Sequence, residues 1–233
     1  MNSSSRRFQP ATHLLIRSQE MIWKKRIAKS KHMENKIPKQ VEGKALDCFK
    51  SVDMPSQAEA ATFFEHIKGK LLDVNNWHQI TKTPSATFTI VNIHGQTIER
   101  HVQKGDYIRI DIPGPGLPSA NGYDWVQVED ITEKAEGANN SILLTLRPSA
   151  DPTQEDTDTA HFFKRLATSS ILAEREGSQI FLHYAGRNEI INTDNASMLD
   201  NLRNFTVGLG AKLGASFPQW KALIEGLGDA DDR

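Results

Sequence analysis

The chain has 233 residues, of which 38% are hydrophobic and 24% are charged, and it contains four Trp and ten Phe. This composition can build a packed core and excludes wholesale disorder. The single cysteine, Cys48, excludes an intramolecular disulfide and any metal site made of several thiolates. Because no apolar run reaches the roughly 18 residues of a membrane span and no secretion signal is present, we expect a soluble, cytoplasmic protein that does not cross a membrane.

Charge divides the sequence into two parts. Residues 1–32 contain eight Lys or Arg and one acid, Glu20; removing them from the totals of 28 basic and 29 acidic residues leaves 20 and 28. An acidic body repels phosphate backbones, so we expect no nucleic-acid partner. We interpret residues 1–32 as a leader that is disordered or that results from a misassigned start. A flexible basic arm and a targeting segment remain the alternatives.

The first strong helix signal follows Pro55. Ser56 and Glu59 have the spacing of a capping box, and apolar residues then recur at helical intervals as far as Leu71. The pattern predicts a helix from Ser56 to about Leu72, followed by a turn or short helix that carries Trp77. Residues 33–55 are an N-terminal extension or a first strand, the latter over residues 43–52.

From Thr87 onward the period becomes alternating, and β-branched and aromatic residues dominate. Short turns that contain Gly separate several of the apolar runs, which is typical of antiparallel neighbours. The polar, proline-bearing residues 148–158 predict a surface loop, and a short helical turn is expected at 161–166. The predicted strands are residues 87–93, 97–102, 107–112, 123–131, 141–147, 168–175 and 179–185.

Helical spacing returns near the C-terminus. Apolar residues from Met198 to Leu213 recur every three or four positions, and Gly214 ends this predicted helix. A second capping box at Ser216 begins a last helix with Trp220 on its apolar face. We therefore predict one α+β domain over residues 56–228, with a mostly antiparallel curved sheet of about seven strands between an N-terminal helix and a C-terminal helix pair. Residues 229–233 form an acidic tail.

This order of elements, from Ser56 to Leu213, resembles the helix-grip families, which include the START-like lipid-binding proteins and the polyketide cyclases. The resemblance implies a cavity between a curled meander and a long C-terminal helix. No family motif is matched residue by residue, so no functional residue is carried over. The excursion before Thr168 and the break at Gly214 depart from the family pattern. A partly open β-barrel with flanking helices is the alternative fold.

Familiar catalytic and cofactor motifs are missing from the sequence. Residues 113–116, Pro-Gly-Pro-Gly, could suggest a phosphate-binding loop, but each proline removes an amide that such a loop needs. The histidines show no metal-binding spacing, and no GxSxG or SxxK is present. We expect no cofactor and no metal.

Polar and aromatic residues near strand ends form the candidate binding site. If their strand faces point inward, they line a polar pocket between the sheet and the C-terminal helix. The alternative is the solvated outer face that an antiparallel sheet commonly shows. The candidates are Trp77, Arg109, Trp125, Arg147, Tyr184, Arg187 and Glu189.

Three functions fit these residues. The leading hypothesis is a domain that binds a small, partly apolar ligand, oriented by Arg109, Arg147 or Arg187. The second is an enzyme in which a carboxylate and a histidine act as acid and base, and the third is a protein interaction module. The carboxylates for the second are Asp111, Asp124 and Glu129, and the histidines are His161 and His183.

Overall fold

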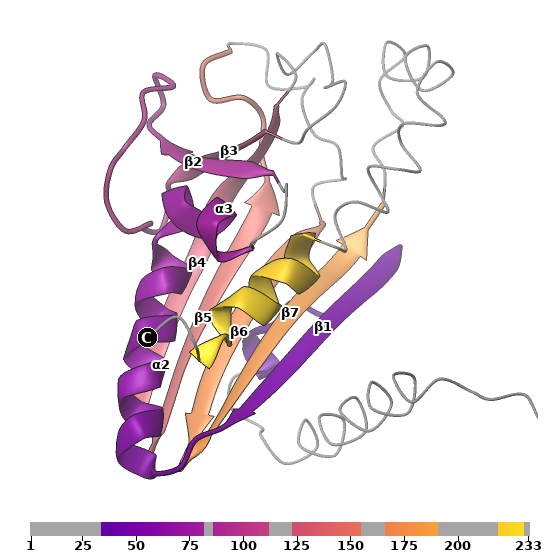
Figure 1. The fold of residues 1–233 in the computed structure, drawn as a ribbon. Coiled ribbons are helices and arrows are strands. Elements are labelled where there is room, and N and C mark those ends of the chain that lie inside the picture. Colours follow the sequence, from indigo (N-terminus) through magenta and orange to yellow (C-terminus); the bar gives the residue numbers. More distant parts are fainter. Residues whose placement is uncertain (1–33, 82–85, 112–122, 155–165, 191–218, 231–233) are drawn as a thin grey trace, which may run out of the picture. The chain divides into compact units, whose positions relative to one another are not determined.

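The computed structural model describes residues 34–81, 86–111, 123–154, 166–190 and 219–230 (Figure 1). The chain divides into a unit that ends at Lys36 and a compact unit that begins at Ile37. Of the first unit, only the 3-10 turn η1 (Glu34–Lys36) is described. The second contains β1 (Lys44–Asp53), α2 (Gln57–Leu72), η2 (Val74–Asn76), α3 (Trp77–Ile80), β2 (Thr87–Val91), β3 (Tyr107–Asp111), β4 (Asp124–Glu136), β5 (Asn139–Pro148), β6 (Thr168–Glu176), β7 (Gln179–Glu189) and a C-terminal helix described over 219–227.

The seven described strands form one antiparallel sheet in the order β1-β7-β6-β5-β4-β3-β2. Strands β2 to β7 are a continuous meander, and β1 pairs with β7 over nine residue pairs from Lys44 to Asp53. The edge strands β1 and β2 do not pair, so the sheet is open and curved (Figure 1). The predicted α+β, helix-grip-like fold is confirmed. The sheet does not close into a barrel, so the alternative fold is not adopted.

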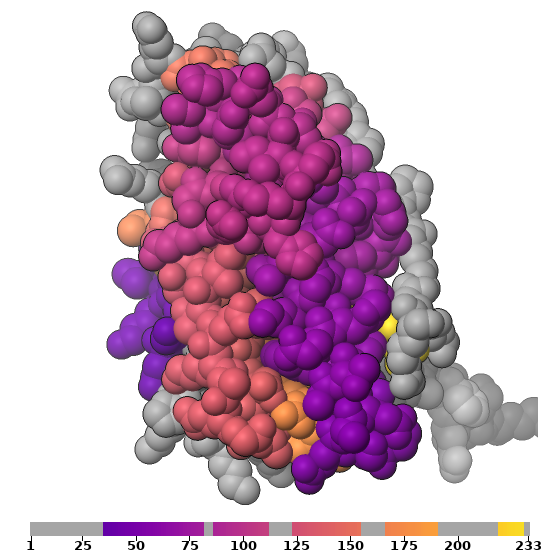
Figure 2. Space-filling view, turned by 90° about the vertical axis from the view of Figure 1, so that its left-hand side faces the viewer, coloured from indigo at the N-terminus to yellow at the C-terminus, as the bar shows by residue number. Residues whose placement is uncertain are grey.

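The start of α2 follows from its capping residue. Ser56 has extended backbone angles, and its Oγ accepts a hydrogen bond of 3.1 Å from the amide of Glu59. The apolar side of the helix, which includes Phe63 and Ile67, is buried against the sheet. Figure 2 shows α2 beside the β4–β5 hairpin, to which an ion pair between Lys68 and Glu133 joins it. The predicted helix is confirmed.

The strand predicted at residues 97–102 is wrong. Only a single bridge, between Val91 and Thr97, connects this segment to β2. The side chain of Asn75 takes hydrogen bonds that this segment and β2 would otherwise make with each other. Its Nδ2 donates to the Ile98 carbonyl at 2.9 Å, and its Oδ1 accepts from the Ile90 backbone amide at 2.8 Å. Val102 in turn donates to the carbonyl of Leu72. The segment is therefore attached to the end of α2 instead of the sheet. The sheet still has seven described strands, because β1 takes the place of the wrongly predicted strand in the count.

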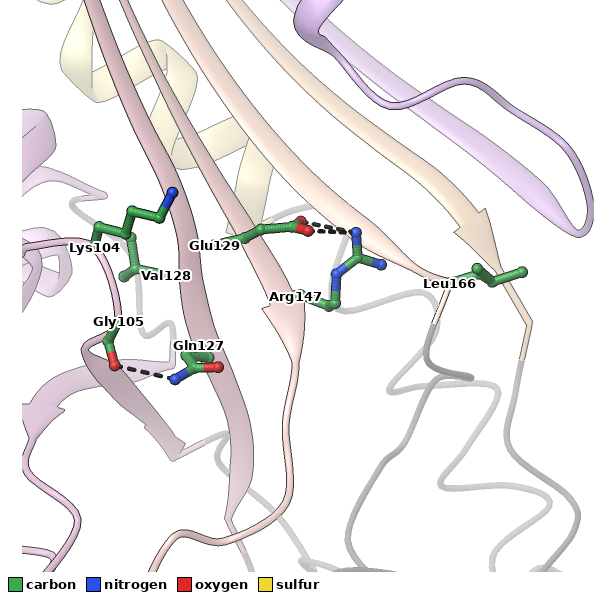
Figure 3. A pocket seen from close by; sticks show the side chains of 7 residues that line it. All are labelled: Lys104, Gly105, Gln127, Val128, Glu129, Arg147 and Leu166. Atoms are coloured by element: carbon green, nitrogen blue, oxygen red, sulfur yellow. Dashed lines mark hydrogen bonds and ion pairs between the residues drawn. The ribbon is translucent and has the colours of Figure 1, made fainter.

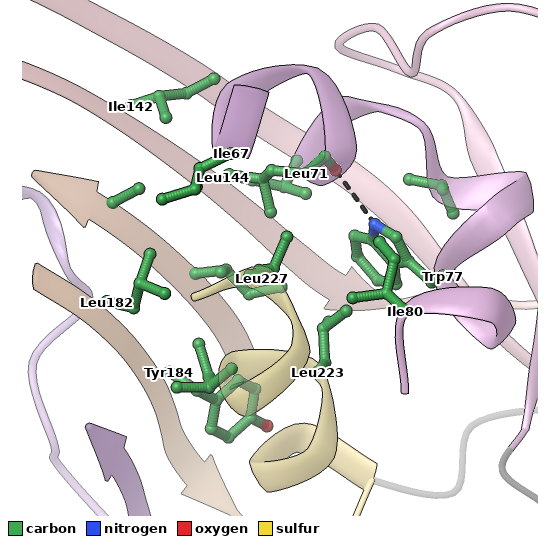
Figure 4. Packing of buried hydrophobic residues seen from close by; sticks show 14 of the residues in the cluster. Ile67, Leu71, Trp77, Ile80, Ile142, Leu144, Leu182, Tyr184, Leu223 and Leu227 are labelled. Atoms are coloured by element: carbon green, nitrogen blue, oxygen red, sulfur yellow. Dashed lines mark hydrogen bonds between the residues drawn. The ribbon is translucent and has the colours of Figure 1, made fainter. Parts of the chain in front are cut away.

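The longer described helices cover one face of the sheet, called here the inner face (Figure 1). Strand residues that point inward, such as Ile142, Leu144 and Leu182, pack beneath α2 and the C-terminal helix (Figure 4). The alternation along β5 is regular, because Leu144 lies on the inner face whereas Leu143 and Thr145 lie on the opposite, outer face. The main apolar core therefore lies between the inner face and the helices.

Side chains on the outer face are also buried along the central strands. An antiparallel sheet more commonly leaves this face to water. Along these strands, every second residue points inward and belongs to the main core. The residues between them point outward and are buried as well. The buried outer side chains include Leu143, Leu172, Phe181, His183 and Ala185.

The C-terminal helix is fixed at its end by close backbone contact. A Cβ atom on Gly226 would overlap the carbonyl oxygen of Ile80, so only glycine allows this approach to α3. Lys50 of β1 donates to the carbonyl of Glu225 at 2.6 Å and pairs with its carboxylate at 3.3 Å. The helix thus bridges α3 and the β1 edge. The helix predicted over 198–213, the Pro-Gly segment 113–116 and His161 lie outside the described residues.

Candidate functional site

The seven predicted site residues lie on two different faces of the sheet. Trp77 and Tyr184 are part of the inner core. Arg109 lies between two core-facing isoleucines and is paired with Trp125 across the strands, so both face outward. The other two outer residues are Arg147, paired with Gln127, and Arg187, paired with Thr168. The sheet does not bring the seven candidates together into one pocket.

Glu189 reaches the inner face because of a β-bulge. Leu46 of β1 pairs with Gly186 of β7, and Lys44 of β1 pairs with Glu189 of β7. Between these two pairs β1 advances by two residues and β7 by three, so β7 contains one extra residue. The extra residue reverses the alternation at the end of β7. Asn188 lies at the irregularity with a left-handed φ of 56°. Glu189 therefore shares the inner face with Gly186.

Asn188 holds this bulge in place. Its Oδ1 accepts from the amides of Val41 and Glu42 at 2.7 and 3.2 Å, and its Nδ2 donates to the carbonyl of Lys39 at 3.0 Å. The Asn188 amide in turn donates to Oε1 of Gln40 at 2.9 Å. Asparagine tolerates the left-handed conformation better than most residues do. The segment before β1 thus locks the geometry that directs the next residue of β7 inward.

Three polar side chains form a group that we call the inner polar end: Ser169, Tyr184 and Glu189. The hydroxyls of Ser169 and Tyr184 lie 2.9 Å apart. Burial, and next the charge of Glu189, raise the pKa of Tyr184 well above its ordinary value. Burial also raises the pKa of Glu189, although the charges of Arg187 and Lys44 oppose this. Among the described residues, no donor hydrogen-bonds to the Glu189 carboxylate.

An aromatic seam adjoins the inner polar end. The ring of Trp220, from the C-terminal helix, stacks on Tyr184 with centroids 4.6 Å apart and planes at 14°. Trp220 also meets Trp77 edge to face at 6.4 Å and Phe88 at 6.0 Å. Trp77 is anchored by its indole nitrogen, which donates to the carbonyl of Leu71 at 3.1 Å (Figure 4). Trp220 is only partly buried, so the seam ends at the surface of the core.

A polar triad lies on the outer face where β1 meets β7. Oδ1 of Asp47 is 2.8 Å from Nε2 of His183 and accepts from Nη2 of Arg187 at 2.7 Å. Burial alone would raise the pKa of the Asp47 carboxyl, but the hydrogen bonds from His183 and Arg187 outweigh it and lower that pKa. Burial lowers the pKa of His183 despite the neighbouring carboxylate.

The sequence patterns point to His183 and Arg187 but not to Asp47, their common partner. Asp47 is 136 residues away from His183 in sequence. The three carboxylates proposed as partners for a histidine do not take this place; one of them, Glu129, binds Arg147 instead. Only the pairing of β1 with β7 brings Asp47 to this position.

The outer face also has a hollow of about 720 Å³, lined by seven residues (Figure 3). Its polar side chains already have partners within the protein. One nitrogen of Arg147 contacts both carboxylate oxygens of Glu129 at 2.8 Å, and Gln127 donates to the carbonyl of Gly105 at 3.2 Å. Nζ of Lys104 lies 3.3 Å from Oδ1 of Asp130 in β4. The lining residues are Lys104, Gly105, Gln127, Val128, Glu129, Arg147 and Leu166.

Neither a metal cluster nor a membrane-spanning helix occurs in the described part of the chain. Within those ranges, no group of three or more His, Cys, Asp or Glu side chains is placed to hold a metal ion. None of the described helices has the length and apolar character to cross a membrane.

Similar folds occur among solved structures, at low sequence identity. A STAR-related lipid transfer protein from Xanthomonas axonopodis is 14% identical, with 78% of this chain and 86% of that chain covered and a TM-score of 0.39. A START superfamily protein from Mycobacterium smegmatis is 14% identical, with coverage of 79% and 99% and a TM-score of 0.33.

A third similar structure is the Zhui aromatase/cyclase from Streptomyces sp. R1128, which is 12% identical, with coverage of 79% and 93% and a TM-score of 0.35. No family model matches the sequence, and no curated protein matches it. Similarities of this size carry no argument about function.

Proposed function

We propose that this protein binds a small, largely apolar molecule between β7 and the C-terminal helix, and that the ligand carries a hydroxyl or amine at its polar end. The observation that carries the proposal is the carboxylate of Glu189. It lies on the inner face, is half-buried, and has no hydrogen-bond donor among the described residues. A buried carboxylate without a donor is costly, so a ligand donor would stabilise it.

The surroundings of Glu189 suit such a ligand. The paired hydroxyls of Ser169 and Tyr184 offer further hydrogen-bonding groups on the same face. The stacked rings of Tyr184 and Trp220 offer an apolar surface beside them. Ligand sites commonly combine apolar walls with a few polar groups that fix orientation. The ligand would lie against this seam, where Trp220 already stacks on a flat aromatic partner.

The polarity of the site differs from the sequence prediction. The arginines expected to orient a ligand, Arg109, Arg147 and Arg187, face outward, away from the C-terminal helix. Within the inner polar end, the charged group is the acid Glu189. The proposal therefore selects ligands that donate a hydrogen bond rather than ligands that carry a carboxylate.

Isothermal titration calorimetry with two matched probes tests the proposal. The probe 2-naphthol has a flat apolar ring and one hydroxyl donor, whereas 2-methoxynaphthalene has the same ring without the donor. We expect saturable binding of 2-naphthol and binding of the ether that is weaker by about tenfold to a hundredfold, because a hydrogen bond to a charged group contributes roughly 1.5–3 kcal/mol. Equal affinities for the two probes would contradict the proposal.

Variants then locate the binding. Glu189→Ala removes the carboxylate and Tyr184→Phe removes only a hydroxyl, and each should weaken 2-naphthol binding several-fold. The control is Glu65→Ala, which removes an exposed carboxylate from α2. It should leave binding unchanged. If Glu189→Ala and Tyr184→Phe both bound 2-naphthol as tightly as the wild type, the inner polar end would not be the site.

A further inference from the structure

We propose a second, separate site on the outer face: Arg109 of β3 and Trp125 of β4 form an oxyanion site that binds the carboxylate group of a small molecule. The two residues are directly opposite each other in the antiparallel register. Directly paired side chains on one face have Cβ atoms about 4.5–5.5 Å apart. The two side chains are therefore neighbours on the outer face.

Trp125 supplies a buried donor without an acceptor. The residue is 5% exposed, and its Nε1 is shielded from solvent and has no hydrogen-bond partner in the described part of the chain. The indole N–H can donate but cannot accept. Buried polar groups are almost always hydrogen-bonded, so an unmatched one needs an explanation. An acceptor atom from a ligand would supply it.

Arg109 differs from the other arginines that the structure describes. Arg100 binds Asp106, and the remaining three each bind a carboxylate or an amide oxygen of a neighbouring strand or turn. By contrast, the guanidinium of Arg109 lies 4.8 Å from the ring centroid of Tyr123 and makes no hydrogen bond or ion pair with the described residues. The ring holds the cation in place, and the N–H donors of Arg109 stay unmatched by that part of the chain.

The donors define the chemical class of the ligand. Both residues offer N–H groups and no acceptor, so the ligand must present oxygens, and the guanidinium favours an anion with two of them. Asp111 is exposed two residues along β3 on the same face, and its charge opposes a dianion such as phosphate more than a monoanion. A carboxylate therefore fits better.

The rest of the molecule has space nearby. Gln127, two residues beyond Trp125 on the same face of β4, lines the outer hollow (Figure 3). Two residues along a strand span about 6.6 Å, the width of a small ring. A carboxylate at Arg109 and Trp125 can thus carry a body that extends toward the hollow.

Nuclear magnetic resonance of the indole groups tests this site. The protein is labelled with ¹⁵N, the Trp125 indole signal is assigned from Trp125→Phe, and sodium benzoate is titrated against sodium chloride at equal ionic strength. We expect a saturable downfield shift of the Trp125 indole proton with benzoate and none with chloride. Sodium phosphate should give a weaker response. No saturable shift, or a stronger response to phosphate than to benzoate, would overturn the proposal.

Variants connect the shift to Arg109. Arg109→Gln should abolish the benzoate response, and Arg109→Lys should weaken it because the charge remains while the planar fork is lost. Arg100→Gln is the matched control, since this exposed arginine already binds Asp106 and does not line the hollow, and it should respond like the wild type. Thermal unfolding shows whether each variant is folded. An unchanged response in Arg109→Gln and Arg109→Lys would overturn the assignment.

The two proposals fail separately. Glu189→Ala, which should weaken 2-naphthol binding, should leave the benzoate response of Trp125 unchanged. Loss of the benzoate response in this variant would show that the anion does not bind at the outer face.

Discussion

The carboxylate of Glu189 occupies the space that a side chain on Gly186 would fill. A Cβ atom on Gly186 would overlap Oε1 of Glu189 and would lie 3.2 Å from the Cβ of Leu46. Glycine at this position therefore permits the carboxylate to lie over the inner face of β7. The bulge at Asn188 directs Glu189 there, and Gly186 leaves it room.

Replacing Gly186 should displace that carboxylate. In Gly186→Ala the added methyl group pushes Glu189 toward water, so the pKa of its carboxyl should fall toward the ordinary value and 2-naphthol binding should weaken. The crowding should cost about 1–3 kcal/mol of the free energy of unfolding. A ¹³C titration of the side-chain carboxyl measures the pKa. An unchanged pKa would contradict this placement of Glu189.

Glu189 should also make stability depend on pH. Its pKa is raised in the folded state above the ordinary 4.5, so the folded protein holds this proton more tightly than the unfolded chain does. The corresponding stabilisation is present below pH 4.5 and is lost as the pH rises through the folded pKa. Glu189→Gln has no carboxyl to titrate, so its free energy of unfolding should not fall in this way. As the pH rises, the variant should become more stable relative to the wild type. Urea unfolding at a series of pH values measures the difference, and parallel curves would contradict it.

The triad of Asp47, His183 and Arg187 should act in the opposite direction. The folded pKa of His183 is below 6.5 and that of Asp47 is below 3.8. Their contributions are present at neutral pH and are lost as the pH falls through the folded values. Asp47→Asn should lower the pKa of His183 further, because the carboxylate that favours the charged ring is removed. A ring-proton titration of His183 tests this, and a higher pKa in the variant would contradict it.

Two glycines should respond in opposite ways to alanine. Gly226→Ala should destabilise the protein by about 3 kcal/mol, because the new methyl group meets a backbone carbonyl that cannot move aside easily. Gly69→Ala, inside α2 with nothing within 4 Å of the new atom, should instead stabilise it by about 0.5–1 kcal/mol. Urea unfolding of both variants provides the comparison. Equal effects would show that the C-terminal helix is not held as described.

Cys48 should be chemically inert in the folded protein. Burial, with a smaller effect of Asp47, raises the pKa of its thiol to about 12, so almost no thiolate exists at around pH 8. A thiol-reactive disulfide reagent should therefore label it slowly in buffer and rapidly in denaturing urea. Fast labelling under native conditions would show that the β1 edge opens, because Cys48 is a buried residue of this strand.

Local signals were sufficient for part of this fold. The cap at Ser56 and the helix after it depend on residues three or four positions apart, which sequence shows directly. The segment 97–102 has strand composition, but Asn75 takes up its backbone groups, and no local pattern reveals this competition. Intrinsic preference is a weak guide where a tertiary contact competes.

The site was harder to predict for a related reason. Successive strand residues alternate between the two faces of a sheet, and a single bulge shifts every later residue of that strand to the other face. Glu189 and Arg187 therefore lie on opposite faces although they are two residues apart. Asp47 joins His183 only through the pairing of the first and last strands. Asn188, with its left-handed backbone, was the residue that could have indicated the bulge.

The most direct test of the proposed function is an isotope-filtered nuclear Overhauser measurement on the labelled protein with bound 2-naphthol. We predict cross-peaks from the naphthol protons to the ring protons of Tyr184 and Trp220, which stack beside Glu189. Cross-peaks to outer-face residues such as Trp125, with none to Tyr184 or Trp220, would contradict the proposed site.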